Sequence, residues 1–252
     1  MTENLATGQR YGEILVITMR RDQKRNAIDV EMAEALDHLF NELDDDDRLR
    51  VGILAGGEAA FSAGTDISGD PPPPTKRGGE YGFVRRLRTK PVIAAVEGPA
   101  LGGGFELVLA CDLVVASHKA RFGLPEVSRG LFACCGGVFR LPRALPLNVA
   151  KMAALTGEPI DAETCHRFGL VNVLTEPGQA VETAVQIGER ICANAPISVA
   201  QTLGAMDSCL GADDALAWEI SERANRTVLD SDDSKIGKEA FARKVTPNWT
   251  GR

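Results

Sequence analysis

The sequence predicts an α/β protein that ends in a layer of helices. Before residue 178, continuous apolar runs alternate with helical patterns, which is typical of strands that are buried on both faces. From about residue 178 onward, apolar residues recur at helical spacing only. The chain has 252 residues, of which 44% are hydrophobic, so it can bury one large core. We therefore expect an α/β core over 1–195 and a helical region over 196–252.

The predicted elements follow one another in a strand–helix order. The first strand is expected over 13–19, and Asp29 is a suitable N-cap for a helix that runs to about residue 43. Further buried strands are expected over 51–55, 91–96, 112–116 and 121–124, and C-terminal helices over 180–195, 197–209, 213–229 and 235–244.

Two segments between these elements carry little regular pattern. Residues 69–82 contain four consecutive prolines and repeated glycines, which exclude a regular element. We expect a mobile surface loop there, and a loop of this length inside a compact domain is often functional. The acidic run over 44–47 is expected to be a solvated linker without a function of its own.

Composition excludes several classes of function. The chain has 35 acidic and 28 basic residues, and its formal charge of -7 argues against nucleic acid or an anionic membrane as a partner. No stretch approaches the roughly 18 consecutive apolar residues of a membrane span. The six cysteines lack CxxC or metal-finger spacing, so we expect reduced thiols, no metal site and a cytoplasmic location.

A triple glycine and two glutamates carry the strongest functional signal. Gly102, Gly103 and Gly104 open into an apolar helix with Glu106 in its first turn. Glycines let a backbone approach a ligand, and the N–H groups of a helix start are free to bind one. Glu106 lies among apolar residues, so burial should raise its pKa. The alternative is a salt-bridged core glutamate.

Glu126 follows Pro125 at the end of a predicted strand. Taken alone, Glu126 can have a purely structural role as an acid at a helix N-terminus, where the helix dipole favours it. Together with Glu106, however, it can form a pair in which one carboxyl group acts as general base and the other as general acid.

Other catalytic motifs fit poorly. Residues 61–67 follow a strand and can supply another backbone N–H, but a nucleophile elbow on Ser62 needs glycine where Ala60 stands. A dinucleotide-binding interpretation of the triple glycine fails because Leu107 occupies the place of the last small residue.

Taken together, the chain resembles the crotonase, or enoyl-CoA hydratase/isomerase, family. The segments that carry this resemblance extend along nearly the whole chain, in order, over 24–28, 61–67, 91–98, 100–106, 122–126, 136–143, 155–157 and 169–172. The resemblance implies the crotonase fold, a spiral of repeated ββα units followed by C-terminal helices that form a homotrimer, often within a dimer of trimers. It also implies an acyl-CoA thioester substrate and no separate cofactor, since coenzyme A is part of the substrate.

The resemblance also assigns site residues. Glu106 and Glu126 match the catalytic acids, and the backbone N–H groups of Thr65 and Gly103 match the oxyanion hole that holds the thioester oxygen. The positions that match the coenzyme A site are Asn26, Ala27, Ala63, Thr65, Asp66 and Ile67, with Phe241 and Lys244 at the adenosine phosphate, often on a neighbouring subunit.

The glutamate pair favours hydration of a trans-2-enoyl-CoA to a 3-hydroxyacyl-CoA, with Glu106 activating water and Glu126 giving a proton to the α-carbon. One departure is Cys134, which stands near the water site where the family usually has glycine. It is either a harmless exchange of small residues or a sign of another reaction, such as carnitinyl-CoA dehydration or enoyl-CoA isomerisation. A non-catalytic acyl-CoA-binding scaffold is a further alternative.

Overall fold

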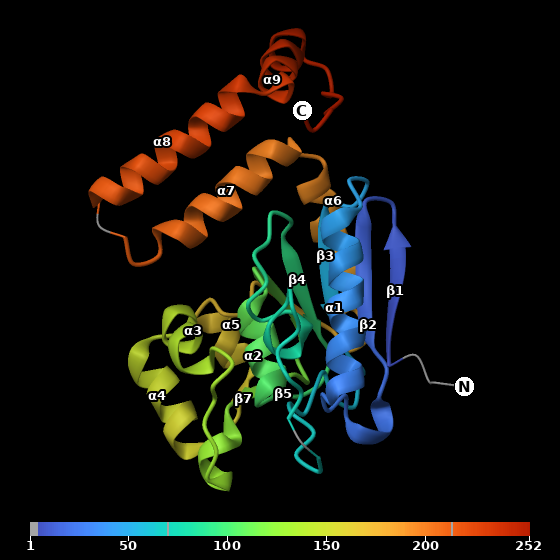
Figure 1. Cartoon of the computed structure of the whole chain (residues 1–252), viewed down its shortest axis with the longest axis vertical. Coiled ribbons are helices and arrows are strands. Elements are labelled where there is room, and N and C mark those ends of the chain that lie inside the picture. Colours follow the sequence, from blue (N-terminus) through green and yellow to red (C-terminus); the bar gives the residue numbers. More distant parts are fainter. Residues whose placement is uncertain (1–4, 70, 213) are drawn as a thin grey trace.

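The computed structural model describes residues 5–69, 71–212 and 214–252. Figure 1 shows a layered core of strands and helices, from one end of which three helices extend. These are α7 (Pro196–Cys209), α8 (Asp214–Asp230) and α9 (Asp232–Arg243). The boundary expected between 195 and 196 falls directly before α7.

The larger sheet has six strands in the order β1-β2-β3-β4-β6-β9. Their bounds are β1 (Ala6–Tyr11), β2 (Ile14–Met19), β3 (Val51–Ala55), β4 (Val92–Val96), β6 (Leu113–Ser117) and β9 (Val173–Thr175). β1 pairs with β2 in antiparallel register, and all other neighbours are parallel. This is the parallel, doubly covered sheet that the apolar runs predict.

Successive residues of the central strands face two hydrophobic layers. Ile53 and Ile93 pack toward α6 (Ala180–Cys192), whereas Leu54 and Ala94 belong to the main core on the opposite face. Side chains of a strand alternate between its faces, and every residue of β3 and β4 is buried. The main core also holds the apolar sides of α1 (Val30–Asp45) and α2 (Gly103–Ala110).

Repeated strand–strand–helix units link this sheet to a smaller one. The smaller sheet contains β5 (Ala100–Leu101), β7 (Arg121–Gly123) and β8 (Ile160–Asp161). β4 leads through β5 into α2, and β6 leads into β7. In the preceding units of the spiral, single parallel bridges take the place of the short strands. They join Ile28 to Thr65 and Ser62 to Ala100. The spiral of ββα units is therefore confirmed.

The remaining elements are short or lie at the edges. They are η1 (Asp22–Lys24), η2 (Glu80–Gly82), η3 (Pro125–Arg129), α3 (Gly137–Ala144), α4 (Leu147–Thr156) and α5 (Ala162–Arg167). Within the described ranges, no helix combines the length and the apolarity needed to cross a membrane.

The expected loop over 69–82 is more ordered than its composition suggests. Thr75 and Gly79 form a bridge, and Glu80–Gly82 form the 3-10 helix η2, so the prediction that no regular element forms there is wrong for these residues. Asp37 of α1 holds the segment because its Oδ1 accepts hydrogen bonds from Thr75 Oγ1 at 2.7 Å and from the Gly78 N–H at 3.0 Å.

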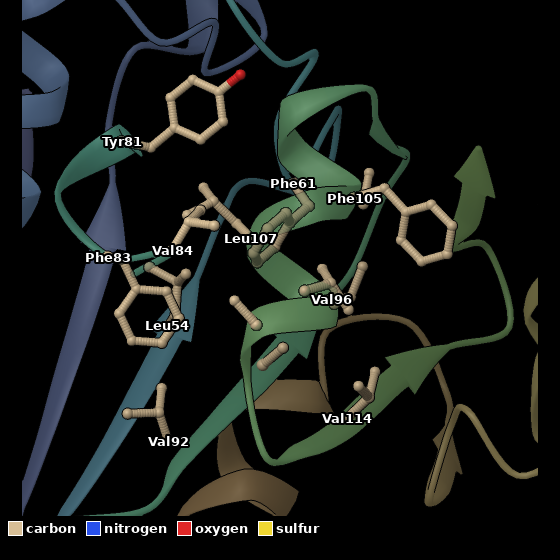
Figure 2. Packing of buried hydrophobic residues seen from close by; sticks show 14 of the residues in the cluster. Leu54, Phe61, Tyr81, Phe83, Val84, Val92, Val96, Phe105, Leu107 and Val114 are labelled. Atoms are coloured by element: carbon tan, nitrogen blue, oxygen red, sulfur yellow. The ribbon is translucent and has the colours of Figure 1, made fainter. Parts of the chain in front are cut away.

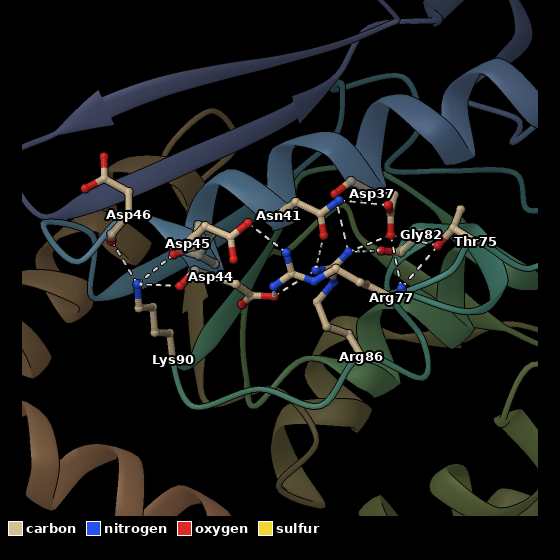
Figure 3. A network of polar contacts seen from close by, with 12 residues as sticks. Asp37, Asn41, Asp44, Asp45, Asp46, Thr75, Arg77, Gly82, Arg86 and Lys90 are labelled. Carbon is tan, nitrogen blue, oxygen red and sulfur yellow. Dashed lines mark hydrogen bonds and ion pairs between the residues drawn. The ribbon is translucent and has the colours of Figure 1, made fainter.

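The acidic run at the end of α1 is not simply solvated. Asp44 pairs with the buried Arg86 at 2.7 Å, and Asp46 pairs with Arg10 at 2.8 Å. Figure 3 shows the part of this network around Asp44 and Arg86, in which Lys90 also donates to carbonyl groups at the carboxyl end of α1. The run therefore anchors the segment that contains Arg86.

Candidate active site

The N-terminus of α2 requires its glycines for two physical reasons. Gly102 has φ 56° and ψ −128°, a conformation that favours glycine. A Cβ on Gly104 would lie 2.7 Å from the Cβ of Ser62 and closer still to the Ser62 carbonyl oxygen, so only glycine fits. These glycines bring the start of α2 against the segment that follows β3.

This close approach brings the backbone before Thr65 against the backbone of Gly103. Gly64 has φ 88°, and a Cβ there would lie 2.8 Å from the nitrogen of Gly103. Within the described part of the chain, neither the Thr65 nor the Gly103 N–H donates to another backbone group. The two N–H groups that the resemblance assigns to the oxyanion hole are thus neighbours that have not been used by the fold.

Glu106 is buried beside these groups, with 2% of its surface exposed. Burial raises its pKa to about 6, partly opposed by the Gly137 N–H, which donates to Oε1 at 2.9 Å. The charge of Glu126 raises that pKa further. Among the described ion pairs none involves Glu106, so the alternative of a salt-bridged core glutamate is not supported.

Glu126 reaches the same place from η3. A Cβ on Gly102 would lie 3.3 Å from its Oε1, so its carboxyl group lies against the N-terminus of α2. Burial raises the pKa of Glu126, and its buried Oε2 has no hydrogen-bond partner in the described part of the chain. An unpartnered buried carboxyl oxygen is costly in a fold and is therefore a common feature of a functional site.

The thiol beside Glu106 belongs to Cys135 and not to Cys134. Cys135 is buried, and its amide and thiol act on Glu106 as hydrogen-bond donors that lower the pKa of this carboxyl group. Cys134 is exposed, with its Sγ 3.8 Å from the Sγ of Cys135. The turn before α3 directs only the second thiol toward Glu106, and the expected place of Cys134 near a water site stays a prediction.

The residues expected to bind coenzyme A differ in their exposure and in whether their side chains are free to contact a ligand. Ala63 and Ile67 are exposed, but Asn26 is fully buried, and its amide group donates to the carbonyl groups of Ala60 and Phe61. Asn26 therefore holds two segments together and cannot present its side chain to a ligand. Ala27 is also buried, and Asp66 is partly buried and pairs with Arg21 at 2.8 Å.

The expected adenosine-phosphate pair is separated from the two glutamates within one chain. Phe241 lies near the end of α9 and Lys244 directly after it, and Figure 1 places α9 at the end of the molecule away from α2. Lys244 is exposed, whereas the side chain of Phe241 lies outside the described part of the chain.

Sequence reasoning missed Tyr81 and Gly137. The Tyr81 hydroxyl lies 2.8 Å from Thr65 Oγ1, and the Tyr81 ring packs against Gly103. The signal available was weak: Tyr81 begins the short run Tyr-Gly-Phe-Val that ends the proline- and glycine-rich segment. Gly137 lies within a segment that carries the resemblance, but its hydrogen bond to Glu106 requires the fold.

The chain is similar along its length to proteins of one family. The family model described as Enoyl-CoA hydratase/isomerase matches residues 9–252. "Enoyl-CoA hydratase EchA19" of Mycobacterium tuberculosis is 35% identical over 254 residues, which cover 97% of this chain and 96% of that protein. "Carnitinyl-CoA dehydratase" of Salmonella typhi is 37% identical over 258 residues, which cover 96% and 97%.

A solved structure extends this similarity to the fold. The crystal structure of an enoyl-CoA hydratase from Mycobacterium tuberculosis H37Rv matches with a TM-score of 0.95 and 40% identity, and it covers 99% of this chain and 100% of the other. The similarity therefore includes both the ββα core and the three helices that extend from it.

Proposed function

The chain belongs to the enoyl-CoA hydratase/isomerase family and has the crotonase fold, and from this premise we propose that it adds water to a trans-2-enoyl-CoA to give a 3-hydroxyacyl-CoA. The observation that carries the proposal is the position of two carboxyl groups, that of the buried Glu106 and that of the half-buried Glu126, at a helix start with two unused N–H groups. No metal or separate cofactor is part of the proposal.

The two N–H groups suit the charge that this reaction creates. When a nucleophile adds to the β-carbon of an unsaturated thioester, negative charge moves to the carbonyl oxygen. The N–H groups of Thr65 and Gly103 would hold this oxygen, and the positive end of the α2 dipole adds to their effect. Removing one such donor in other enzymes costs roughly 2.7–4 kcal/mol of transition-state stabilisation.

The two carboxyl groups suit the proton transfers. With its pKa at about 6, Glu106 is mostly ionised at neutral pH and would accept a proton from the attacking water. Burial raises the pKa of Glu126, and its Oε2 has no hydrogen-bond partner in the described part of the chain, so this carboxyl group would carry the proton that is delivered to the α-carbon. The β-carbon would then carry the hydroxyl group of the water and the α-carbon the proton from Glu126, and the proton left on Glu106 would return to Glu126 through solvent before the next turnover.

The experiment is an assay of the purified protein with crotonyl-CoA and with longer trans-2-enoyl-CoA thioesters. Hydration removes the absorbance of the conjugated thioester and adds the mass of one water to the product. Turnover of none of these substrates by the wild-type chain would refute the proposal.

Substitution of the two glutamates tests, in the same assay, whether their carboxyl groups take part in the reaction. We expect Glu106→Gln and Glu126→Gln each to lower kcat by roughly 10²-fold or more, the usual scale of acid–base catalysis. Glu189→Gln is the matched control, because Glu189 is exposed on α6, which packs on the face of the larger sheet opposite the main core. Rates close to wild type in both variants would remove the pair from the mechanism.

Carnitinyl-CoA dehydration is a second candidate, favoured by the Salmonella typhi relative. Incubation with carnitinyl-CoA distinguishes it, since dehydration lowers the mass of the substrate by one water. We further propose that the enzyme acts in the cytoplasm as a homotrimer or a dimer of trimers.

A further inference from the structure

Tyr81 lies at the candidate site, but the proposed hydration gives it no role. Its side chain is 5% exposed, and its ring belongs to the main hydrophobic core. Figure 2 shows the ring above Val84 and the hydroxyl group pointing away from the apolar cluster. Tyr81 has φ 56° and ψ 19° inside η2, a left-handed conformation that is unfavourable for a bulky residue. A strained backbone thus directs a polar group out of the core.

The hydroxyl group of Tyr81 lies beside both residues of the proposed oxyanion hole. It is 2.8 Å from Thr65 Oγ1. A Cβ on Gly103 would lie 2.6 Å from the Tyr81 Cζ and closer still to the hydroxyl oxygen, so the ring fits only because residue 103 is glycine. Tyr81 therefore occupies the space next to the two residues that would hold the thioester oxygen.

On its other side, Tyr81 contacts the residue that lies against Glu106. Its hydroxyl is in hydrogen-bonding contact with the thiol of Cys135, which in turn donates to Glu106. A tyrosine hydroxyl has one proton to donate and can accept hydrogen bonds as well. The Thr65 hydroxyl can donate to it, whereas its own proton is directed at the sulfur of Cys135, a weak acceptor that an oxygen bound at the N–H groups can replace.

Two further observations suit Tyr81 to act as a preorganised donor. Burial raises the pKa of Tyr81, so the phenol stays protonated at neutral pH. The turn that carries it is held by Arg86, which donates to the Gly82 carbonyl oxygen at 3.2 Å and to Asp37 Oδ1 at 2.6 Å (Figure 3). A donor that is held in place in this way need not reorganise when charge develops.

We propose that Tyr81 is a further catalytic residue, whose hydroxyl contacts the substrate and donates a third hydrogen bond to the thioester oxygen as this oxygen gains charge. The inference rests on the proposed function and adds a side-chain donor to the N–H groups of Thr65 and Gly103. A donor that is stronger for the enolate than for the ground-state carbonyl acts mainly on kcat.

The first test is Tyr81→Phe, which keeps the buried ring and removes only the hydroxyl. We expect kcat for crotonyl-CoA to fall by roughly 10²-fold, the scale of losing one oxyanion donor, with little change in KM and in melting temperature. The matched control is Tyr11→Phe, because Tyr11 is exposed on β1, and it should match wild type in all three measurements.

The second test uses the fact that the chain has only two tyrosines. Labelling with 3-fluorotyrosine gives two ¹⁹F signals, which Tyr11→Phe assigns. Addition of butyryl-CoA, a saturated thioester that cannot be hydrated, should shift the Tyr81 signal and leave the Tyr11 signal in place. Because this measurement needs no substitution at Tyr81, it remains decisive if Tyr81→Phe does not fold.

The outcomes separate this inference from the proposed function. Wild-type kcat in Tyr81→Phe, or a Tyr81 signal that does not move at saturating butyryl-CoA, overturns the inference. A lower KM with unchanged kcat also overturns it, since the hydroxyl would then obstruct the site. If the wild-type chain hydrates no enoyl-CoA, the proposed hydration fails, and a shifted Tyr81 signal would still support substrate contact.

Discussion

In the proposed reaction, the ionisation of Glu106 links activity to stability. Its pKa in the folded chain is about 6, above the ordinary value of 4.5, because burial disfavours the charged form. As the base of the proposed reaction it must be ionised, so kcat/KM should fall about tenfold per pH unit below about pH 6. The stability of the fold depends on pH in the opposite way. The buried position favours the neutral carboxyl group, so ionisation of Glu106 lowers the free energy of unfolding.

The first prediction follows from that conflict. A raised folded-state pKa contributes stability below pH 4.5, and this contribution is lost as the pH rises through about 6. The loss corresponds to about 2 kcal/mol. Glu106→Gln, whose amide oxygen can still accept the Gly137 N–H, should therefore be nearly inactive but at least as stable as wild type at pH 8. Urea unfolding at pH 5 and pH 8 tests this. A variant that is less stable than wild type at pH 8 would contradict it.

At this scale, sequence patterns predicted what depends on local chemistry. An acid among apolar residues after a glycine run was expected to be buried with a raised pKa, and Glu106 confirms both expectations. The neighbour of Glu106 depends instead on the backbone direction in the turn before α3, which no spacing reveals. Cys134 and Cys135 are adjacent and chemically identical, so only the fold decides which thiol points inward.

Among the elements, η2 and α1 are coupled through one buried arginine. The Arg86 side chain is 1% exposed and donates to Asp37, Asn41, Asp44 and the Gly82 carbonyl oxygen. Removing one partner of a buried ion pair leaves the other charge buried without a partner, which typically lowers the free energy of unfolding by about 3–5 kcal/mol. Because Gly82 follows Tyr81, this network also determines where the Tyr81 hydroxyl lies.

The second prediction compares two adjacent arginines. We expect Arg86→Met to lower the free energy of unfolding by about 3 kcal/mol, and to lower kcat as well because Tyr81 loses its support. Arg85→Met is the matched control, since the Arg85 side chain is 71% exposed and its pair with Glu80 should contribute no more than about 1 kcal/mol. Urea unfolding and the crotonyl-CoA assay measure both variants. Equal losses in the two would show that the buried network is not what holds η2.

Element prediction succeeded where hydrophobic periodicity was strong. The strand over 51–55 and the helix capped by Asp29 were both predicted, and Asp29 accepts the Met32 N–H as an N-cap should. β5 and β8 have two residues each, too few for a periodic signal. β1 was missed because its sequence, ATGQRY, is mostly polar and it pairs at the sheet edge, with most of its residues exposed.

For the whole molecule, the helices after residue 195 leave apolar surface uncovered in a single chain. α7 has no buried residue, although its sequence is rich in apolar residues, and Trp218 of α8 is 70% exposed. Large apolar side chains exposed on two packed helices, here also Met206 of α7, indicate an interaction surface. This supports the proposed homo-oligomer, and it agrees with the separation of Lys244 from Glu106 within one chain.

The third prediction joins assembly to substrate binding. If a neighbouring subunit supplies Lys244 to the adenosine phosphate of coenzyme A, Lys244→Ala should raise KM roughly tenfold, the effect of losing about 1.4 kcal/mol of charge-assisted hydrogen bonding, and should leave kcat nearly unchanged.

Trp218→Asp should shift the mass measured by light scattering from a trimer or hexamer toward one chain and should raise KM in parallel. The control is Arg223→Asp, at another exposed position of α8. An assembled Trp218→Asp variant would contradict the proposed interface. A monomeric variant with wild-type KM would instead show that coenzyme A is bound within one chain, because binding would then survive without the neighbour.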